Sequence, residues 1–258
     1  DADVAICVLG DDTSLNGEGR DRATLKLTGA QQELLMAVYE TGTPVALVII
    51  SGKPLSIEWA AQRVPAVLAA WNPGMQGGRA IAEVLFGDVN PCGKLSVSWP
   101  RHVGQQPVYY NQVPGWHAES YADMDAEPLW PFGHGLSYTT FEYSELSLLA
   151  DRLRADETLS VSIQVENTGD RAGTEIVQLY VNDLYSSVTT PRKELKAFAR
   201  VDLEPGEKRR VSLEVPCARL ALVSADLEWV VEPGRFELMV GPSSRDEDLL
   251  RAQFEVVE

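Results

Sequence analysis

Cysteine and histidine are scarce in this sequence of 258 residues. The cysteines are odd in number and far apart, which excludes a disulfide framework and a paired Cys-x-x-Cys zinc site. They are Cys7, Cys92 and Cys217. The histidines are equally scattered and have no carboxylates at metal-ligand spacing. They are His102, His117 and His134. We therefore expect structural cysteines, no metal site and no cofactor.

Long apolar runs, phosphate-binding loops and excess positive charge are also missing. The longest apolar run, Val45–Ser51, is far shorter than the ~20 residues of a membrane-spanning helix. The glycine-rich segment 74–78 (GMQGG) lacks the Lys-Ser/Thr ending of a phosphate loop, and no Gly-x-Gly-x-x-Gly pattern occurs. With 22 basic and 38 acidic residues, the net charge is −16. We expect no nucleic-acid or membrane partner, because both surfaces carry like charge.

The first part of the chain alternates apolar strand-like runs with helical patterns. Its expected strands are Val4–Leu9, Val45–Ile50 and Ala66–Trp71, and its expected helices are Thr28–Tyr39, Ile57–Arg63 and Gly77–Leu85. Thr28 suits the N-cap of the first helix. Continuous apolar strands separated by helices and glycine-rich turns predict an open, mostly parallel α/β sheet. The first strand has no partner before it, so we expect this domain to lack its early strands and to expose apolar surface there.

The last part of the chain has a period of two. Polar and apolar residues alternate in several segments separated by Gly-, Pro- and Asn-containing turns. These segments are Leu159–Val165, Glu175–Val181, Lys208–Val215, Trp229–Val231 and Phe236–Val240. The pattern predicts an antiparallel sandwich of the immunoglobulin-like class. We expect an α/β domain over 1–104, an aromatic-rich connector over 105–142 and the sandwich over 143–258.

The residues resemble a known family through an ordered set of motifs. These are 17–22 (GEGRDR), 71–78 (WNPGMQGG), 85–95 (LFGDVNPCGKL), 130–141 (WPFGHGLSYTTF), 166–169 (ENTG), 194–198 (ELKAF) and 240–244 (VGPSS). Together they resemble the carboxyl-terminal part of family 3 glycoside hydrolases of the β-glucosidase or β-xylosidase type. One such motif is weak evidence, because glycine-rich turns recur in α/β proteins. The ordered set covers essentially the whole chain.

The resemblance implies an α/β-sandwich domain followed by a fibronectin type III-like domain, both attached to a (β/α)8 barrel in the complete enzyme. It implies hydrolysis of terminal β-linked sugars in oligosaccharides or aryl glycosides, with retention of configuration. The family nucleophile is an aspartate on the barrel, and nothing in this chain matches its surroundings. Members are often periplasmic or secreted, which the cysteines neither require nor exclude.

Glu18 is the candidate catalytic residue. It stands between two glycines in a loop just beyond a strand, where open α/β sheets place functional residues. On residue type alone, a solvated loop carboxylate is the better interpretation. The resemblance favours the general acid/base of a retaining hydrolase, which needs a second carboxylate about 5–5.5 Å away.

Three further residues are candidates for substrate binding: Asp21, Arg22 and Trp116. Asp21 and Arg22 contact sugar hydroxyls or, as the better alternative, form an ion pair that shapes the loop. Trp116 reaches a substrate from the connector or fills a domain interface, whereas Trp71 is expected in the core.

Two functions compete on this evidence. In the first, the chain completes a β-glucosidase active site by offering Glu18 to the barrel. In the second, it is a non-catalytic scaffold or carbohydrate-binding module that stabilises the barrel. Either way we expect no glycosidase activity from this chain alone, because one carboxylate cannot carry a double displacement.

Overall fold

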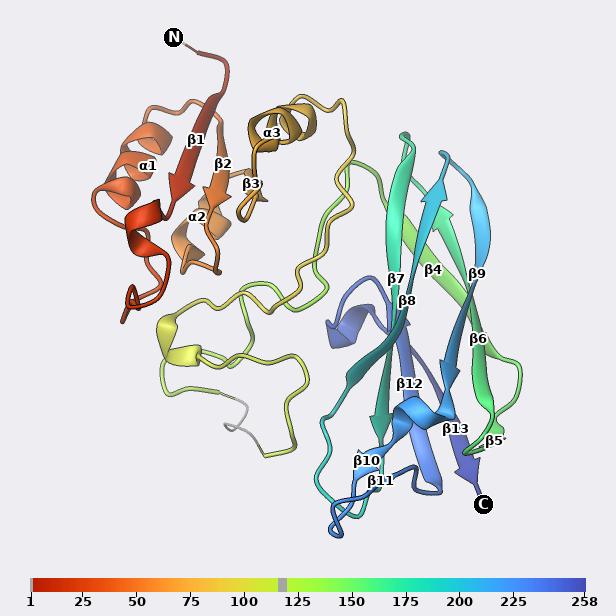
Figure 1. The fold of residues 1–258 in the computed structure, drawn as a ribbon. Coiled ribbons are helices and arrows are strands. Elements are labelled where there is room, and N and C mark those ends of the chain that lie inside the picture. The colour runs from red at the N-terminus through yellow and green to blue at the C-terminus, as the bar shows by residue number, and fades with distance from the viewer. Residues whose placement is uncertain (1, 116–119) are drawn as a thin grey trace. The chain divides into compact units, whose positions relative to one another are not determined.

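The computed structural model describes residues 2–115 and 120–258, which form two compact units (Figure 1). The first unit holds the chain up to Val89 together with 99–108 and 128–130. The second holds 90–98, the described parts of 109–127, and 131–258. The chain therefore passes between the units several times rather than through one linker.

The first unit contains a parallel sheet with strand order β1-β2-β3. Its elements are β1 (Ala5–Gly10), η1 (Thr13–Leu15), α1 (Gln31–Glu40), β2 (Val45–Ile50), α2 (Glu58–Arg63), β3 (Ala66–Ala69), α3 (Gly77–Leu85) and η2 (Val103–Gln105). The expected parallel pairing is present, and the register places Gly10 opposite Ile50. The carboxyl ends of β1 and β2 therefore lie side by side.

Strand burial follows position in this sheet. In the central strand β2, Leu47 and Val48 are fully buried. In β1, at the edge of the sheet, Ile6 and Val8 are 45% and 54% exposed. The expectation of a fully buried first strand is wrong for Ile6 and Val8, because β1 is an edge strand and pairs only with β2 among the described strands. The expected exposed apolar surface at this edge is confirmed.

Helix α1 begins later than the sequence predicts. Its N-cap position is Ala30 rather than Thr28, and Ala30 makes no side-chain capping bond. Gly29 has a φ of +57°, so the backbone turns through the left-handed region before the helix starts. The Thr28 hydroxyl instead accepts a hydrogen bond from the Gln31 side chain at 2.9 Å. The helix then packs through Leu35, which is fully buried.

The indole of Trp99 lies at the centre of an aromatic cluster in the first unit. It is 1% exposed and donates from Nε1 to the Leu55 carbonyl at 2.7 Å. Trp71 and Trp130 pack against it at centroid distances of 5.7 Å and 5.6 Å. The expectation that Trp71 belongs to the core is met only in part: Trp71 packs against the buried Trp99 but is itself half-buried.

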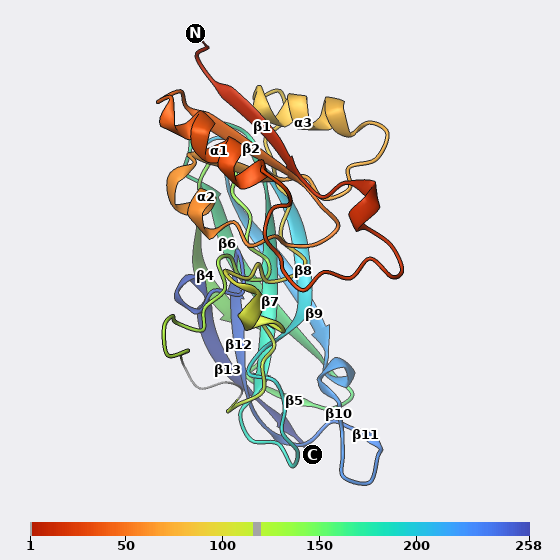
Figure 2. The same cartoon turned by 90° about the vertical axis from the view of Figure 1, so that its left-hand side faces the viewer.

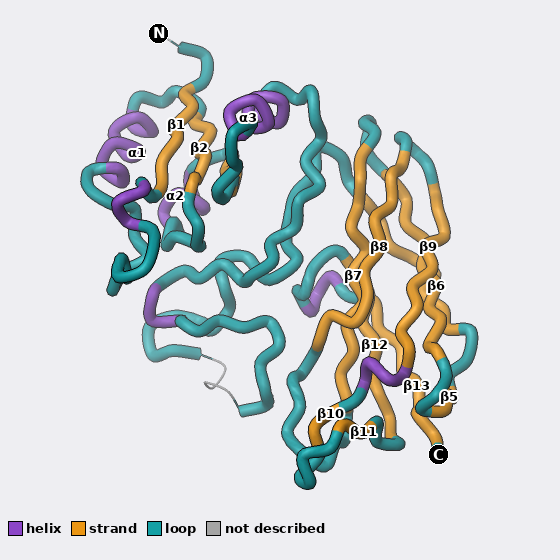
Figure 3. Tube along the Cα trace, in the orientation of Figure 1, coloured by secondary structure: helices purple, strands orange, loops and turns teal. Residues whose placement is uncertain are grey.

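The second unit is a β-sandwich (Figures 2 and 3). Its elements are β4 (Phe141–Leu148), β5 (Arg152–Arg154), β6 (Thr158–Asn167), β7 (Gly173–Asp183), β8 (Glu194–Leu203), β9 (Lys208–Pro216), η3 (Cys217–Leu220), β10 (Leu222–Val223), β11 (Trp229–Val230), β12 (Gly234–Gly241), η4 (Asp246–Asp248) and β13 (Leu250–Val257). One sheet has the order β5-β13-β12-β7-β8, the other β4-β6-β9, and β10 pairs with β11. The pairs are antiparallel except β13 with β5.

The sandwich core comes from the inward residues of alternating strands. In β6, every second residue from Leu159 to Val165 is buried. These side chains pack against residues of the other sheet, including Val177, Leu179 and Leu238. The period-two pattern thus predicted the inward face of β6 correctly, because this sheet buries only one face. In β7, by contrast, the consecutive residues Val177–Val181 are all buried, so both faces of that strand are covered. Strand β4 begins at Phe141, two residues inside the expected connector.

Candidate active site

The candidate loop joins the end of β1 to the start of α1. It begins at Gly10, whose φ is +144°, and a Cβ there would lie 1.9 Å from the Ile50 carbonyl oxygen. Only glycine fits this approach to the neighbouring strand. The Asp11 amide then donates to the same Ile50 oxygen at 3.0 Å, extending the strand contact by one residue.

Asp11 is a buried carboxylate at this strand end. Its side chain has no exposed surface, and Arg22 Nη1 and Lys53 Nζ reach its two oxygens at 2.7 Å and 2.5 Å. The Ser51 hydroxyl donates to Oδ2 at 3.2 Å. A buried carboxylate requires such partners, because an unpaired charge out of water is very costly. Sequence reasoning overlooked both Asp11 and Lys53.

The loop next forms a short 3-10 turn. The Asp12 carboxylate caps it by accepting from the Ser14 amide at 2.7 Å and from the Ser14 hydroxyl at 2.5 Å. These hydrogen bonds from the Ser14 hydroxyl and amide lower the pKa of Asp12. Asn16 Nδ2 donates back to the Asp12 carbonyl at 2.9 Å. The segment before Glu18 is therefore held by its own polar groups.

Glu18 stands at the tip of the loop. Gly17 and Gly19 have φ values of +120° and +72°, and the Arg20 amide donates to the Gly17 carbonyl at 3.1 Å. The chain therefore reverses around Glu18, and its side chain is exposed. A carboxylate presented in this way is free to approach a substrate held by another part of an enzyme.

The return limb of the loop is tied to the strand end. Gln31, the first residue of α1, accepts from the Gly10 amide at 2.7 Å and donates to the Gly10 carbonyl at 2.8 Å. Arg22 Nη2 donates to the Lys26 carbonyl at 2.6 Å. One amide side chain thus joins the first residue of the loop to the first residue of the helix.

The sequence candidates have different surroundings. Glu18 and Asp21 are exposed, whereas the Arg22 side chain is only 12% exposed. The ion pair of Arg22 is with Asp11, not with the neighbouring Asp21. Trp116 and His117 lie outside the described residues.

The remaining histidines and two of the cysteines, Cys92 and Cys217, lie away from this loop in the sequence, whereas Cys7 lies in β1 just before it. His102 caps η2, and burial beside Arg245 and Lys94 lowers the pKa of His134 to about 4. In the described part of the chain no group of three potential metal ligands occurs, and all three cysteines are free. No helix of the described residues is long and apolar enough to cross a membrane.

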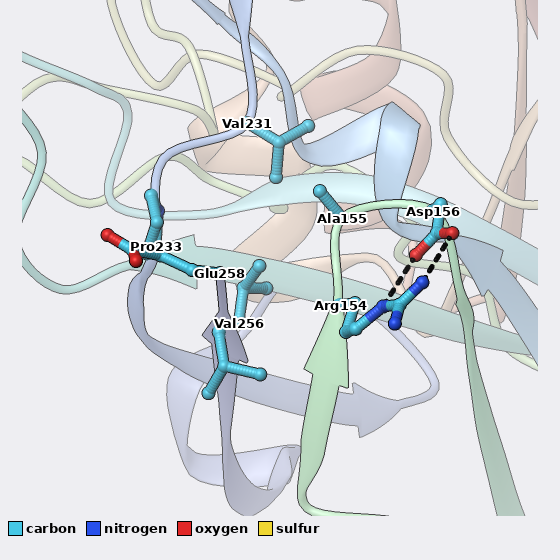
Figure 4. A pocket seen from close by; sticks show the side chains of 8 residues that line it. Arg154, Ala155, Asp156, Val231, Pro233, Val256 and Glu258 are labelled. Atoms are coloured by element: carbon cyan, nitrogen blue, oxygen red, sulfur yellow. Dashed lines mark hydrogen bonds and ion pairs between the residues drawn. The ribbon is translucent and has the colours of Figure 1, made fainter.

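A hollow of about 470 Å³ lies at one end of the sandwich (Figure 4). Its lining combines apolar side chains, such as Val231 and Val256, with an ion pair between Arg154 and Asp156 at 3.0 Å. Both charged groups are surface-exposed and neutralise each other. Two carboxylates, Asp156 and Glu258, line the hollow, but Asp156 is paired with Arg154 and neither residue lies in the motifs that carry the family resemblance, so the loop around Glu18 is the better candidate.

Comparisons with known proteins agree with the motifs. Residues 1–138 match the family model described as the glycosyl hydrolase family 3 C-terminal domain, and residues 175–244 match the fibronectin type III-like domain. The chain belongs to glycosyl hydrolase family 3. The whole β1–α1 loop, with Glu18 at its tip, lies inside the first match, and the strands β8, β9 and β12 lie inside the second.

Similar family 3 proteins are β-xylosidases and β-glucosidases. A β-xylosidase of Formosa agariphila is 47% identical over 251 residues, which cover 96% of this chain and 35% of that protein. The periplasmic β-glucosidase of Salmonella typhimurium is 38% identical over 253 residues, covering 94% and 33%. The structure of a β-glucosidase from Listeria innocua in complex with glucose has a TM-score of 0.93 at 37% identity, covering 99% of this chain and 37% of that one. This family 3 chain therefore spans about a third of the length of these relatives.

Proposed function

We propose that this chain supplies the general acid/base loop to a retaining, exo-acting β-glycosidase of the β-glucosidase type, with Glu18 as the acid/base. The observation that carries the proposal is an exposed glutamate at the tip of a loop that is fixed at both ends, within the family 3 match. The similar proteins named β-glucosidase and β-xylosidase support this reaction class.

The proposed substrate is a terminal β-linked sugar of an oligosaccharide or aryl glycoside. Support comes from the Listeria innocua β-glucosidase, whose structures hold glucose and, in a mutant, laminaribiose. The proposed partner is a (β/α)8 barrel that carries the aspartate nucleophile. We also propose that 1–104 forms the α/β domain, 105–142 the connector and 143–258 the fibronectin type III-like domain.

The proposed chemistry is a double displacement. The barrel aspartate attacks the anomeric carbon, the bond to the leaving oxygen breaks, and Glu18 gives its proton to that oxygen. Water then attacks the glycosyl ester, the Glu18 carboxylate takes the proton from water, and the aspartate leaves with its electron pair. Configuration is retained after two inversions, and the second step regenerates protonated Glu18.

The test is Glu18→Gln in the full-length enzyme, assayed as kcat/KM on phenyl and 2,4-dinitrophenyl β-glucosides. The phenyl substrate needs proton donation, so its kcat/KM should fall about 10²–10⁴-fold, whereas the dinitrophenyl substrate should change little. Azide should raise turnover on the dinitrophenyl substrate and give the β-glycosyl azide, because the small anion replaces activated water.

Glu33→Gln is the matched control, since Glu33 is an exposed carboxylate in the first turn of α1. It should leave kcat/KM on both substrates unchanged. If Glu18→Gln behaves like this control, the acid/base lies elsewhere. The chain is then the scaffold or carbohydrate-binding module of the alternative interpretation.

A further inference from the structure

We infer that Asp11 and Arg22 are positioning residues that hold the Glu18 loop in its reactive conformation. This inference rests on the proposed function of Glu18. It gives a functional role to a buried ion pair at the place where the loop leaves the sheet, although neither member of the pair has a hydrogen bond or ion pair with Glu18.

Asp11 is fixed by the sheet. Its Oδ2 atom is held by the Ser51 hydroxyl and by Lys53; Ser51 directly follows β2, and Lys53 lies two residues later. The Lys53 amide donates to the same Ser51 hydroxyl at 3.2 Å, which orients it. The Oδ1 atom of Asp11 is thereby aimed at the loop, and its direction depends on the rigid pairing of β1 with β2.

Arg22 links the fixed Asp11 carboxylate to the part of the loop that leads back to α1. Nη1 binds Asp11 at 2.7 Å and Nη2 donates to the Lys26 carbonyl at 2.6 Å, so one planar guanidinium spans the base of the loop. With its side chain 12% exposed and both terminal nitrogens engaged, Arg22 is poorly placed to bind sugar hydroxyls. The structure favours a role in loop shape over the substrate-binding role.

The position of Glu18 depends on the ion pair between Asp11 and Arg22 and on the hydrogen bond from Arg22 to Lys26. Among the described residues, its exposed carboxylate has no hydrogen-bond or ion-pair partner, so only the backbone places it. The backbone on either side passes through glycines with positive φ, which permit many other conformations. Loss of the Asp11–Arg22 link should therefore let the tip move while the sheet and α1 stay folded.

A misplaced acid/base leaves a specific kinetic signature. A shift of about 1 Å in a catalytic group costs up to about 10²-fold in rate. The loss falls on reactions that need proton transfer and spares those that do not. A general loss of folding would lower both equally, because it reduces the amount of active enzyme.

The experiment uses Arg22→Met in the full-length enzyme, with kcat/KM measured on phenyl and 2,4-dinitrophenyl β-glucosides. We expect a fall of roughly 10- to 100-fold on the phenyl substrate and less than about threefold on the dinitrophenyl substrate. Arg79→Met is the matched control, since it removes an exposed arginine that pairs with Glu83 at 2.6 Å in the same unit. The control should leave the ratio of the two values unchanged.

Two further variants complete the test. In Glu18→Gln/Arg22→Met, the arginine change should add no further loss, because the group that it positions is already gone. Arg22→Lys keeps a charge for Asp11 but lacks the second arm to Lys26, so it should give an intermediate ratio and serves if Arg22→Met does not fold.

The outcomes separate the two proposals. If Glu18→Gln shows no dependence on the leaving group, the proposed function fails. The positioning role is overturned if Glu18→Gln shows this dependence but Arg22→Met leaves kcat/KM unchanged on both substrates. It is also overturned if Arg22→Met lowers kcat/KM equally on both substrates. Additive losses in the double variant, or a wild-type ratio in Arg22→Lys, also overturn it.

Discussion

Asn167, at the end of β6, offers a sharp test of how the sandwich is held together. Its side chain is fully buried and all of its hydrogen-bonding positions are used. Oδ1 accepts from the Thr139 hydroxyl at 2.6 Å and from the Gly169 amide at 3.1 Å. Nδ2 donates to the carbonyls of Arg171 and Leu203 at 2.7 Å and 3.1 Å. The amide thus joins three segments of the second unit: the one at Thr139, the turn at 169–171 and the end of β8 at Leu203.

Asn167→Asp keeps the shape and replaces the donating nitrogen by an oxygen. Two hydrogen bonds disappear at about 1 kcal/mol each, and two carbonyls then face an acceptor. Burial of the new charge adds further cost. We expect the unfolding free energy to fall by about 3–5 kcal/mol at neutral pH. Part of this should return on acidification, because a protonated aspartic acid again donates one hydrogen bond.

The assay is urea unfolding at about pH 7.5 and about pH 5. Gln164→Glu is the matched control, since Gln164 lies on the same strand, is only half-buried and faces Arg210 across the sheet. It should change the unfolding free energy by less than about 0.5 kcal/mol. A loss below about 1 kcal/mol in Asn167→Asp, or no recovery at the lower pH relative to the control, would refute the reasoning.

Two further predictions concern a glycine and a histidine. Gly10→Ala should unfold the first unit or lower its unfolding free energy by more than about 3 kcal/mol, because the new Cβ would lie 1.9 Å from a backbone oxygen. Gly42→Ala, which has open space around its Cβ position, should lower the unfolding free energy by only about 1 kcal/mol in the same urea titration. Equal losses in the two variants would contradict the steric argument. The pKa of His134 is lowered from 6.5 to about 4 by burial and by Arg245 and Lys94. Its contribution to stability is therefore full above pH 6.5 and is lost as the pH falls to about 4, which lowers the unfolding free energy by roughly 3 kcal/mol. His134→Gln should remove this part of the pH dependence of unfolding, and an unchanged dependence would contradict it.

Regular elements with a strong pattern were predictable from the sequence. The bounds of β2 and α3 agree with the prediction, because one is a continuous apolar run between turns and the other ends at a glycine-containing turn. Helix α1 was predicted to start at Thr28, where local chemistry suits an N-cap. Gly29 displaces the start to Gln31, since its left-handed backbone breaks the helix there.

Other strands were missed for different reasons. In β13, Leu250, Ala252 and Phe254 alternate with polar residues, so the signal was present and was overlooked. β8 is weaker, because it lies at the edge of its sheet and only its last residues alternate cleanly between buried and exposed. An edge strand is in contact with solvent as well as with the core, so its alternation of polar and apolar residues is weaker.

The surroundings of Glu18 required the register of the sheet. Sequence adjacency suggested that Arg22 pairs with Asp21, yet its partner is Asp11 at the strand end. Parallel strands end at the same edge, and the pairing of Gly10 with Ile50 brings Asp11 beside the segment that contains Lys53. The side chain of Asp11 is buried there, and two cations compensate for the cost of removing its charge from water. Arg22 therefore turns inward to pair with Asp11, and Glu18, between the two glycines, remains the exposed carboxylate at the tip of the loop.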